Sequence, residues 1–147
     1  MKRGLDTSVL VYAHIPAFPE HEPIRRFLHG QLATEEVTLV VTPGILHEFV
    51  HVVTDARRFE PPLTMAEALA VARLYLGRSN VECAETDEAA VSRALDLIER
   101  HGLGRKRLAD ALLAATLMNH AVGELITCDP HGFAPFDGLR VTDPRAR

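Results

Sequence analysis

The sequence predicts a single α/β domain of three layers, in which a mostly parallel central sheet is covered by helices on both faces. Short apolar runs of β-forming residues alternate with longer segments of helical periodicity, and this alternation is typical of a parallel sheet. The chain has 147 residues, of which 47% are apolar, so it is long enough for one hydrophobic core and short for two. We therefore expect one domain over residues 1–147.

The first half of the chain is expected to hold two strands and four helices. Thr42 and Pro43 form a helix start, with a capping side chain followed by proline in the first turn. Thr64 and Glu67 have the spacing of a capping box, and the PPLT segment ends the helix before it. The expected strands are 2–6 and 37–41, and the expected helices are 8–14, 24–32, 43–59 and 64–76.

The second half is expected to hold three strands and two helices. Gly102 follows a helical pattern and is placed to end it. The expected strands are 81–85, 124–129 and 139–143, and the expected helices are 87–101 and 108–121. In a parallel sheet of this kind, ligands bind beyond the carboxyl ends of the strands.

Composition excludes several classes of protein. A net charge of −4 argues against a protein whose main role is to coat nucleic acid, but not against an enzyme that binds a few phosphates through metal ions. No apolar run approaches the roughly 20 residues that span a bilayer, and Asp6 interrupts the apolar stretch that a signal peptide would need. We expect a cytoplasmic protein without a membrane segment, in which Cys83 and Cys128 are buried and reduced.

Two acidic residues follow predicted strands directly. Asp6 comes after the first strand and Asp129 after the strand that contains LITC. Either residue alone is most simply a turn residue. Because parallel strands end at one edge of a sheet, both carboxylates are also expected at the edge where ligands bind.

Two further acidic residues lie on or beside apolar helix faces. At 100° per residue, Asp110 shares the face of Leu113 and Leu117. A carboxylate there must be paired, hydrogen-bonded or bound to a cation, although a role in capping the helix is an alternative. Glu48 borders the apolar stripe of its own helix. One cause would explain all four acids, namely a divalent cation held by hard oxygen ligands.

Glu48 also belongs to a zinc-peptidase pattern, His47-Glu48-x-x-His51. Such a site needs a third ligand, and no histidine elsewhere in the chain lies in a recognisable second half of the motif. Both histidines project to the polar side of the predicted helix. We therefore expect them to face solvent beside a functional glutamate.

Three segments together resemble the PIN domain and, more narrowly, the VapC toxins of bacterial toxin–antitoxin pairs. They are LDTSVLVYA, GILHEFVHVV and LADALLAATLMNHAVGELITCDPHGF. The resemblance places the four family acids at Asp6, Glu48, Asp110 and Asp129, as catalytic residues and metal ligands. The hydroxyls that orient these carboxylates or meet phosphate would belong to Thr7, Ser8 and Thr127.

The resemblance implies a Mg²⁺- or Mn²⁺-dependent endoribonuclease that is neutralised by a VapB-type antitoxin and forms a homodimer. RNA would be guided by basic clusters, of which Arg105, Lys106 and Arg107 form the best candidate because they lie just before Asp110. Leu69, Leu74 and Leu76 are expected either in a dimer interface or in the core. The alternatives are a PIN scaffold without activity, the zinc peptidase, and an aspartyl-phosphate receiver, which lacks its acidic pair and lysine here.

Overall fold

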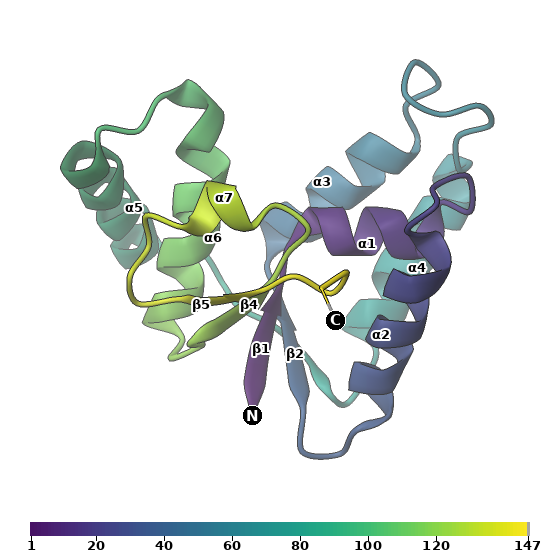
Figure 1. The fold of residues 1–147 in the computed structure, drawn as a ribbon, viewed down its shortest axis with the longest axis horizontal. Helices are drawn as coiled ribbons and strands as arrows, with labels where there is room; N and C mark the ends of the chain where they lie inside the picture. Colours follow the sequence, from purple (N-terminus) through teal and green to yellow (C-terminus); the bar gives the residue numbers. More distant parts are fainter. Residues whose placement is uncertain (147) are drawn as a thin grey trace.

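The structure, a computed structural model, describes residues 1–146 and contains one parallel sheet of five strands. The strands are β1 Lys2–Leu5, β2 Thr38–Val41, β3 Val81–Cys83, β4 Glu124–Ile126 and β5 Arg140–Thr142. Every neighbouring pair runs parallel, in the order β3-β2-β1-β4-β5 (Figure 1). The predicted parallel sheet is confirmed, and it places the ends of β1 and β4 side by side at its centre.

Helices cover both faces of the sheet, which confirms the three predicted layers. The longer helices are α1 Thr7–His14, α2 His21–Ala33, α3 Pro43–Val53, α4 Met65–Leu76, α5 Glu88–His101 and α6 Leu108–Asn119. A 3₁₀ turn, η1 Arg105–Arg107, precedes α6, and the short helix α7 Pro130–Phe133 follows β4. Figure 1 shows α1 to α4 on one side and α5 with α6 on the other. None of the helices formed by residues 1–146 is both long and apolar enough to cross a bilayer.

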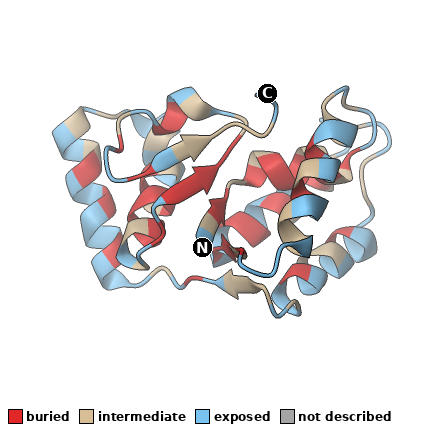
Figure 2. Ribbon diagram, turned by 60° about the horizontal axis from the view of Figure 1, so that its bottom comes forward, coloured by how far each residue is buried: buried red, intermediate tan, exposed pale blue. Residues whose placement is uncertain are grey.

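The hydrophobic core lies along the sheet and the inner sides of the helices (Figure 2). Strand residues such as Leu5, Leu39 and Leu125 are fully buried, as expected for parallel strands that are covered on both faces. Phe49 of α3 and Leu117 of α6 are also fully buried, one in each helical layer. This packing fixes the strand ends from which the site is built.

Several predicted element ends are confirmed by their hydrogen bonds. The Thr42 hydroxyl accepts the amide of Ile45 at 3.2 Å and so caps α3. Thr64 and Glu67 form the expected reciprocal capping box at the start of α4. Gly102 ends α5 with φ of 59°, in the left-handed region that glycine adopts without strain.

Other predictions were wrong. The helix expected over 43–59 ends at Val53, because the chain then tightens into a turn in which the Asp55 amide donates to the Val52 carbonyl at 3.2 Å. Cys83 and Cys128 are both free, but Cys83, at the end of the edge strand β3, is exposed instead of buried. For Leu69, Leu74 and Leu76 two alternatives were open, and their exposure on α4 excludes only a place in the core. The two short helical segments η1 and α7 were not foreseen.

The amino ends of three strands are joined by a buried ion pair. Glu124 at the start of β4 accepts from Arg3 of β1 at 2.7 Å and from Arg140 of β5 at 2.8 Å. Its carboxylate also accepts the Thr142 hydroxyl at 2.7 Å. Glu124 is 5% exposed and the side chain of Arg3 is 12% exposed, so their contact is desolvated, whereas the side chain of Arg140 is exposed. These contacts lie at the edge of the sheet opposite the candidate site.

Candidate active site

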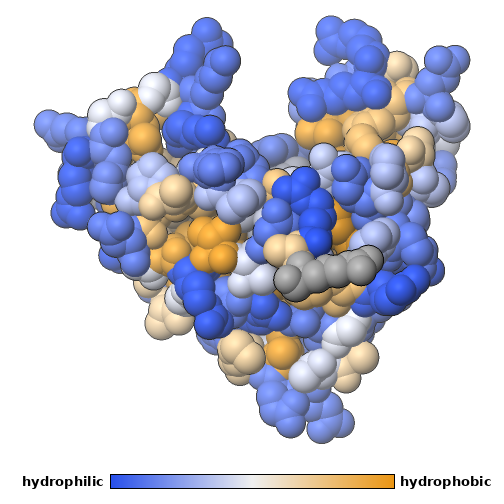
Figure 3. Space-filling view, in the orientation of Figure 1, coloured by the Kyte–Doolittle hydropathy of each residue, from blue (hydrophilic) through white to orange (hydrophobic). Residues whose placement is uncertain are grey.

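A cavity of about 350 Å³ lies at the carboxyl ends of β1 and β4. It is lined by Asp6, Thr7, Ser8, Val11, Tyr12, Phe18, Glu48, Val52, Arg58, Phe59, Asp110 and Asp129. All four predicted acids are therefore brought to one cavity from four separate segments of the chain. Figure 3 shows the molecule hollowed between its two helical arms, with hydrophilic side chains along the rim. A larger cavity of about 440 Å³, between α2 and α4, has no carboxylate in its lining.

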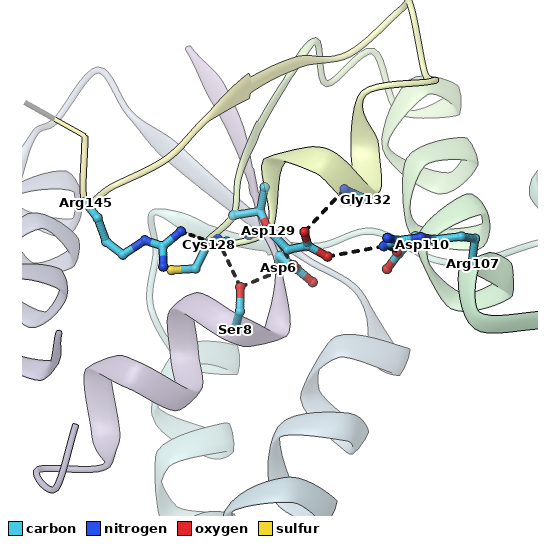
Figure 4. Close-up of polar contacts among 9 residues, drawn as sticks. Asp6, Ser8, Arg107, Asp110, Cys128, Asp129, Gly132 and Arg145 are labelled. Atoms are coloured by element: carbon cyan, nitrogen blue, oxygen red, sulfur yellow. Dashed lines mark hydrogen bonds and ion pairs between the residues drawn. The ribbon is translucent and has the colours of Figure 1, made fainter. Parts of the chain in front are cut away.

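Asp6 is held in place by the chain that surrounds it. Its Oδ1 accepts the Thr7 amide at 2.8 Å, so the side chain caps α1. Its Oδ2 accepts the hydroxyl of Thr127 at 2.7 Å. The same oxygen accepts the hydroxyl of Ser8 at 3.3 Å (Figure 4). An acid directly after a buried strand thus serves as a helix cap while one carboxylate edge still faces the cavity.

Hydroxyl groups connect the end of β1 to the segment after β4. The Thr127 hydroxyl accepts the Asp129 amide at 3.0 Å, and the Ser8 hydroxyl accepts the Cys128 amide at 3.1 Å (Figure 4). Both hydroxyls also donate to Asp6, so they set the relative position of Asp6 and Asp129. The Thr7 hydroxyl differs, because it is buried and has no hydrogen-bond partner among the described residues.

Asp110 and Asp129 share one cation. Nη1 of Arg107 donates to Asp110 Oδ2 at 3.1 Å and to Asp129 Oδ2 at 3.2 Å (Figure 4). Asp129 also caps α7, since its Oδ1 accepts the Gly132 amide at 3.3 Å. Arg107 was predicted to contact RNA, whereas the structure pairs its side chain with two of the four acids.

The acids raise one another's pKa values. Burial raises the pKa of Asp6 to about 6, and the nearby charges of Asp110 and Glu48 add to the rise. Burial also raises the pKa of Glu48, together with the charge of Asp110. The pKa of Asp110 is likewise raised by burial, although Arg107 opposes the rise. Ionising the whole group therefore costs free energy unless a cation compensates.

The donor set fits a hard divalent cation. Carboxylates are the ligands that Mg²⁺ and Mn²⁺ prefer, and four of them line this cavity. The guanidinium of Arg107 already serves as a cation between two of the carboxylates. Within residues 1–146, however, no three His, Cys, Asp or Glu side chains form a ready-made metal cage. Binding would therefore require side-chain adjustment around a backbone that is already in place.

The zinc-peptidase pattern has no structural counterpart in the part of the chain that the structure describes. His47 and His51 are exposed on α3, as predicted, and no third ligand joins them. Glu48 is also exposed, but it lines the cavity, whereas neither histidine does. The glutamate of the pattern thus faces the other acids instead of a zinc site.

Sequence reasoning missed the aromatic wall of the cavity. Tyr12 lies four residues after Ser8 on α1, so helical periodicity from the site residues could have found it. Phe18 and Phe59 come from irregular segments, and only the fold brings their rings together, with centroids 5.6 Å apart. Arg58 also lines the cavity.

Comparison with known proteins gives concordant results. A family model described as the PIN domain matches residues 5–139. Ribonuclease VapC24 of Mycobacterium tuberculosis (strain CDC 1551) is 32% identical over 142 residues, which cover 96% of this chain and 95% of that protein. Ribonuclease VapC33 of the same strain is 29% identical over 139 residues, with 95% of each chain covered.

The fold is also similar to that of solved structures. VapBC-1 from nontypeable Haemophilus influenzae superposes with a TM-score of 0.69 at 14% identity, over 99% of this chain and 100% of that one. The Mycobacterium tuberculosis toxin VapC20, described as cleaving the sarcin–ricin loop, has a TM-score of 0.65 at 15% identity, with 84% and 86% covered. At these identities the likeness concerns the fold alone.

Proposed function

The chain belongs to the PIN-domain family, among the VapC ribonucleases, and on this basis we propose that it is a toxin that cleaves RNA phosphodiester bonds with the help of Mg²⁺ or Mn²⁺. One observation carries the proposal. Four carboxylates that are far apart in the sequence line a single cavity at the carboxyl edge of the sheet. The pKa values of Asp6, Glu48 and Asp110 are raised, as expected for ligands that need a cation.

We assign two roles to the four acids. Asp6, Asp110 and Asp129 would hold the ion, directly or through water, and Glu48 would orient a water or hold a second ion. The bound ion supplies a nucleophilic water at neutral pH and draws charge from the phosphate. Carboxylates suit these ions better than imidazole or thiolate does, in keeping with the absence of His and Cys from the cavity lining.

The hydroxyls support the acids. Thr127 and Ser8 each donate to Asp6 and accept a backbone amide, so their geometry fixes the carboxylate in one orientation. The hydroxyl of Thr7 is buried and would support Glu48, whose pKa it lowers. Loss of these hydroxyls is expected to misplace Asp6 without removing its charge.

Single-stranded RNA is the substrate that suits the cavity. The rings of Tyr12, Phe18 and Phe59 offer faces on which unpaired bases stack. Arg105 and Lys106 are exposed beside the site, where they would contact RNA phosphates. We further propose a cytoplasmic location, a VapB-type antitoxin as partner, and a homodimer to which the exposed Leu69, Leu74 and Leu76 contribute.

RNA cleavage mapping tests the function. The wild-type protein is expected to cut RNA with Mg²⁺ or Mn²⁺ and to stop when EDTA is added, and the Asp6→Asn variant is expected to be inactive under all three conditions. Cleavage that persists in EDTA, or an unaffected variant, would refute the proposed chemistry. A wild-type protein that folds, binds neither ion and cuts no RNA would instead support a scaffold without activity.

Metal affinity is expected to fall steeply below pH 6. Only ionised Asp6 binds the ion, and its folded-state pKa of about 6 lies above the ordinary 3.8. Because the folded-state pKa is the higher one, protonated Asp6 stabilises the fold below pH 3.8, and this stabilisation is lost as the pH rises through 6. Above pH 6 the ionised carboxylate therefore destabilises the ion-free fold, and a bound ion would offset that destabilisation. Calorimetry should show about tenfold weaker Mn²⁺ binding per unit below pH 6. An affinity that is constant from pH 5 to 7.5 would contradict this assignment.

A further inference from the structure

The guanidinium of Arg107 lies between Asp110 and Asp129, where the proposed ion would bind. A single nitrogen, Nη1, contacts one carboxylate oxygen of Asp110 and one of Asp129, which are two of the three proposed ligands of the ion. A divalent ion that binds both carboxylates would bring a second positive centre against this nitrogen. Because like charges at such a distance repel strongly in a partly buried site, both cannot remain there together.

The backbone at Gly132 leaves little room beside the contact of Arg107 with Asp110 and Asp129. A Cβ atom added to Gly132 would lie 2.8 Å from Asp129 Oδ2, 3.1 Å from Asp110 Oδ2, and also against Arg107 Nη1. The backbone of α7 therefore closes one side of the two carboxylates, and glycine is the residue that permits this close approach. The guanidinium nitrogen fills the gap that remains between them.

The backbone of Arg107 is fixed, but its side chain is free to leave. The residue ends the 3₁₀ turn η1, where its amide donates to the Gly104 carbonyl at 3.0 Å. The side chain is 39% exposed, and both of its ion-pair partners are acids of the site. Rotation about its side-chain bonds would move the guanidinium into solvent without disturbing α6.

We propose that Arg107 is a built-in counter-cation that occupies the site until a divalent ion displaces it. This inference rests on the proposed function, and it adds a positioning residue that holds Asp110 and Asp129 together in the ion-free protein. Displacement has a measurable consequence. The apparent affinity for the ion equals the intrinsic affinity multiplied by the fraction of molecules in which the arginine is not seated between the acids. The seated arginine thus lowers metal affinity while it stabilises the ion-free fold.

The test is Mn²⁺ binding by isothermal titration calorimetry at pH 7.5, with thermal unfolding measured on the same samples. We compare the wild type with Arg107→Gln, with the control Arg105→Gln, and with Asp110→Asn. Arg105 is exposed in the same 3₁₀ turn and forms no ion pair with any described residue. We expect Arg107→Gln to bind Mn²⁺ about tenfold more tightly than the wild type, as for a seated fraction near nine in ten.

Thermal unfolding provides a second readout. The ion-free Arg107→Gln protein should unfold at a lower temperature than the wild type and gain more from added Mn²⁺, whereas Arg105→Gln should match the wild type in both. Equal or weaker Mn²⁺ binding by Arg107→Gln would overturn the inference and leave the proposed function intact, even if RNA binding fell. No Mn²⁺ binding by the wild type or by any variant would overturn both.

Discussion

Replacing Asp110 with asparagine is expected to lower kcat/KM for RNA cleavage by about a thousandfold, or roughly 4 kcal/mol of transition-state stabilisation. Asp110 interacts electrostatically with both Asp6 and Glu48, since its charge raises the pKa values of both carboxyls. Asparagine keeps the shape of the side chain but removes the charge that holds a divalent ion. Single-turnover cleavage of a labelled RNA at saturating Mg²⁺ measures the loss.

The fold should survive this substitution. Because the pKa of Asp110 is raised, its ionised form is destabilised in the native protein, and a neutral isostere avoids that cost. The ion-free variant should therefore unfold at a temperature no lower than the wild type at pH 7.5. Asp96→Asn, which changes an exposed acid of α5 outside the cavity, is the matched control and should retain full activity. Activity of Asp110→Asn within tenfold of the wild type would remove Asp110 from the proposed ligand set.

The strand-end acids could be located from the sequence because two simple constraints act on them. An acid that directly follows a buried strand must leave the core at the strand's carboxyl end, and parallel strands bring those ends to one edge. Asp6 directly follows β1, and Asp129 follows β4 after two intervening residues, Thr127 and Cys128. Asp110 was located by a different constraint, since a carboxylate on an apolar helix face has to find a partner. The structure brings all three to the cavity that Glu48 also lines.

The sequence alone does not predict which side chains from distant segments contact one another in the folded protein. The spacing of Arg107 and Asp110 is that of a helical ion pair, but the second partner, Asp129, is 22 residues further on and is brought there by the sheet. The aromatic wall has the same origin, because Phe18 and Phe59 lie in irregular segments without periodicity. The early end of α3 at Val53 is a local tightening of the chain, in which the Asp55 amide donates to the Val52 carbonyl at 3.2 Å, and the apolar periodicity of the segment does not mark it.

The charges at the two edges of the sheet have opposite effects on stability. At the carboxyl edge the acids repel one another and are kept for their proposed chemistry. At the amino edge Glu124 is surrounded by donors, and the hydrogen bonds from Arg3, Thr142 and Arg140 hold its pKa down, at about 2, against the effect of burial. The cross-strand positions of Arg3 and Arg140 beside Glu124 let one carboxylate join β1, β4 and β5. We therefore expect most of the acid sensitivity of the fold to come from the amino edge.

The Glu124→Ala variant is expected to lose on the order of 3–5 kcal/mol of unfolding free energy, because it leaves the guanidinium of Arg3 desolvated without its counter-ion. The side chain of Arg3 is 12% exposed, and its Nε already lacks a partner among the described residues. Urea denaturation at pH 7 measures the loss, with Glu22→Ala, an exposed acid of α2, as the control that should change little.

Two further measurements separate the ion pair from simple loss of packing. The double variant Arg3→Met with Glu124→Leu should recover a large part of the stability, since apolar side chains replace a buried ion pair at little cost. The contribution of Glu124 is complete above its ordinary pKa of 4.5 and is lost as the pH falls toward 2, so the gap between the wild type and Glu124→Gln should close over that range. A gap that stays constant from pH 7 to pH 2.5, or a Glu124→Ala protein within about 1 kcal/mol of the wild type, would show that the charge of Glu124 does not hold the amino edge together.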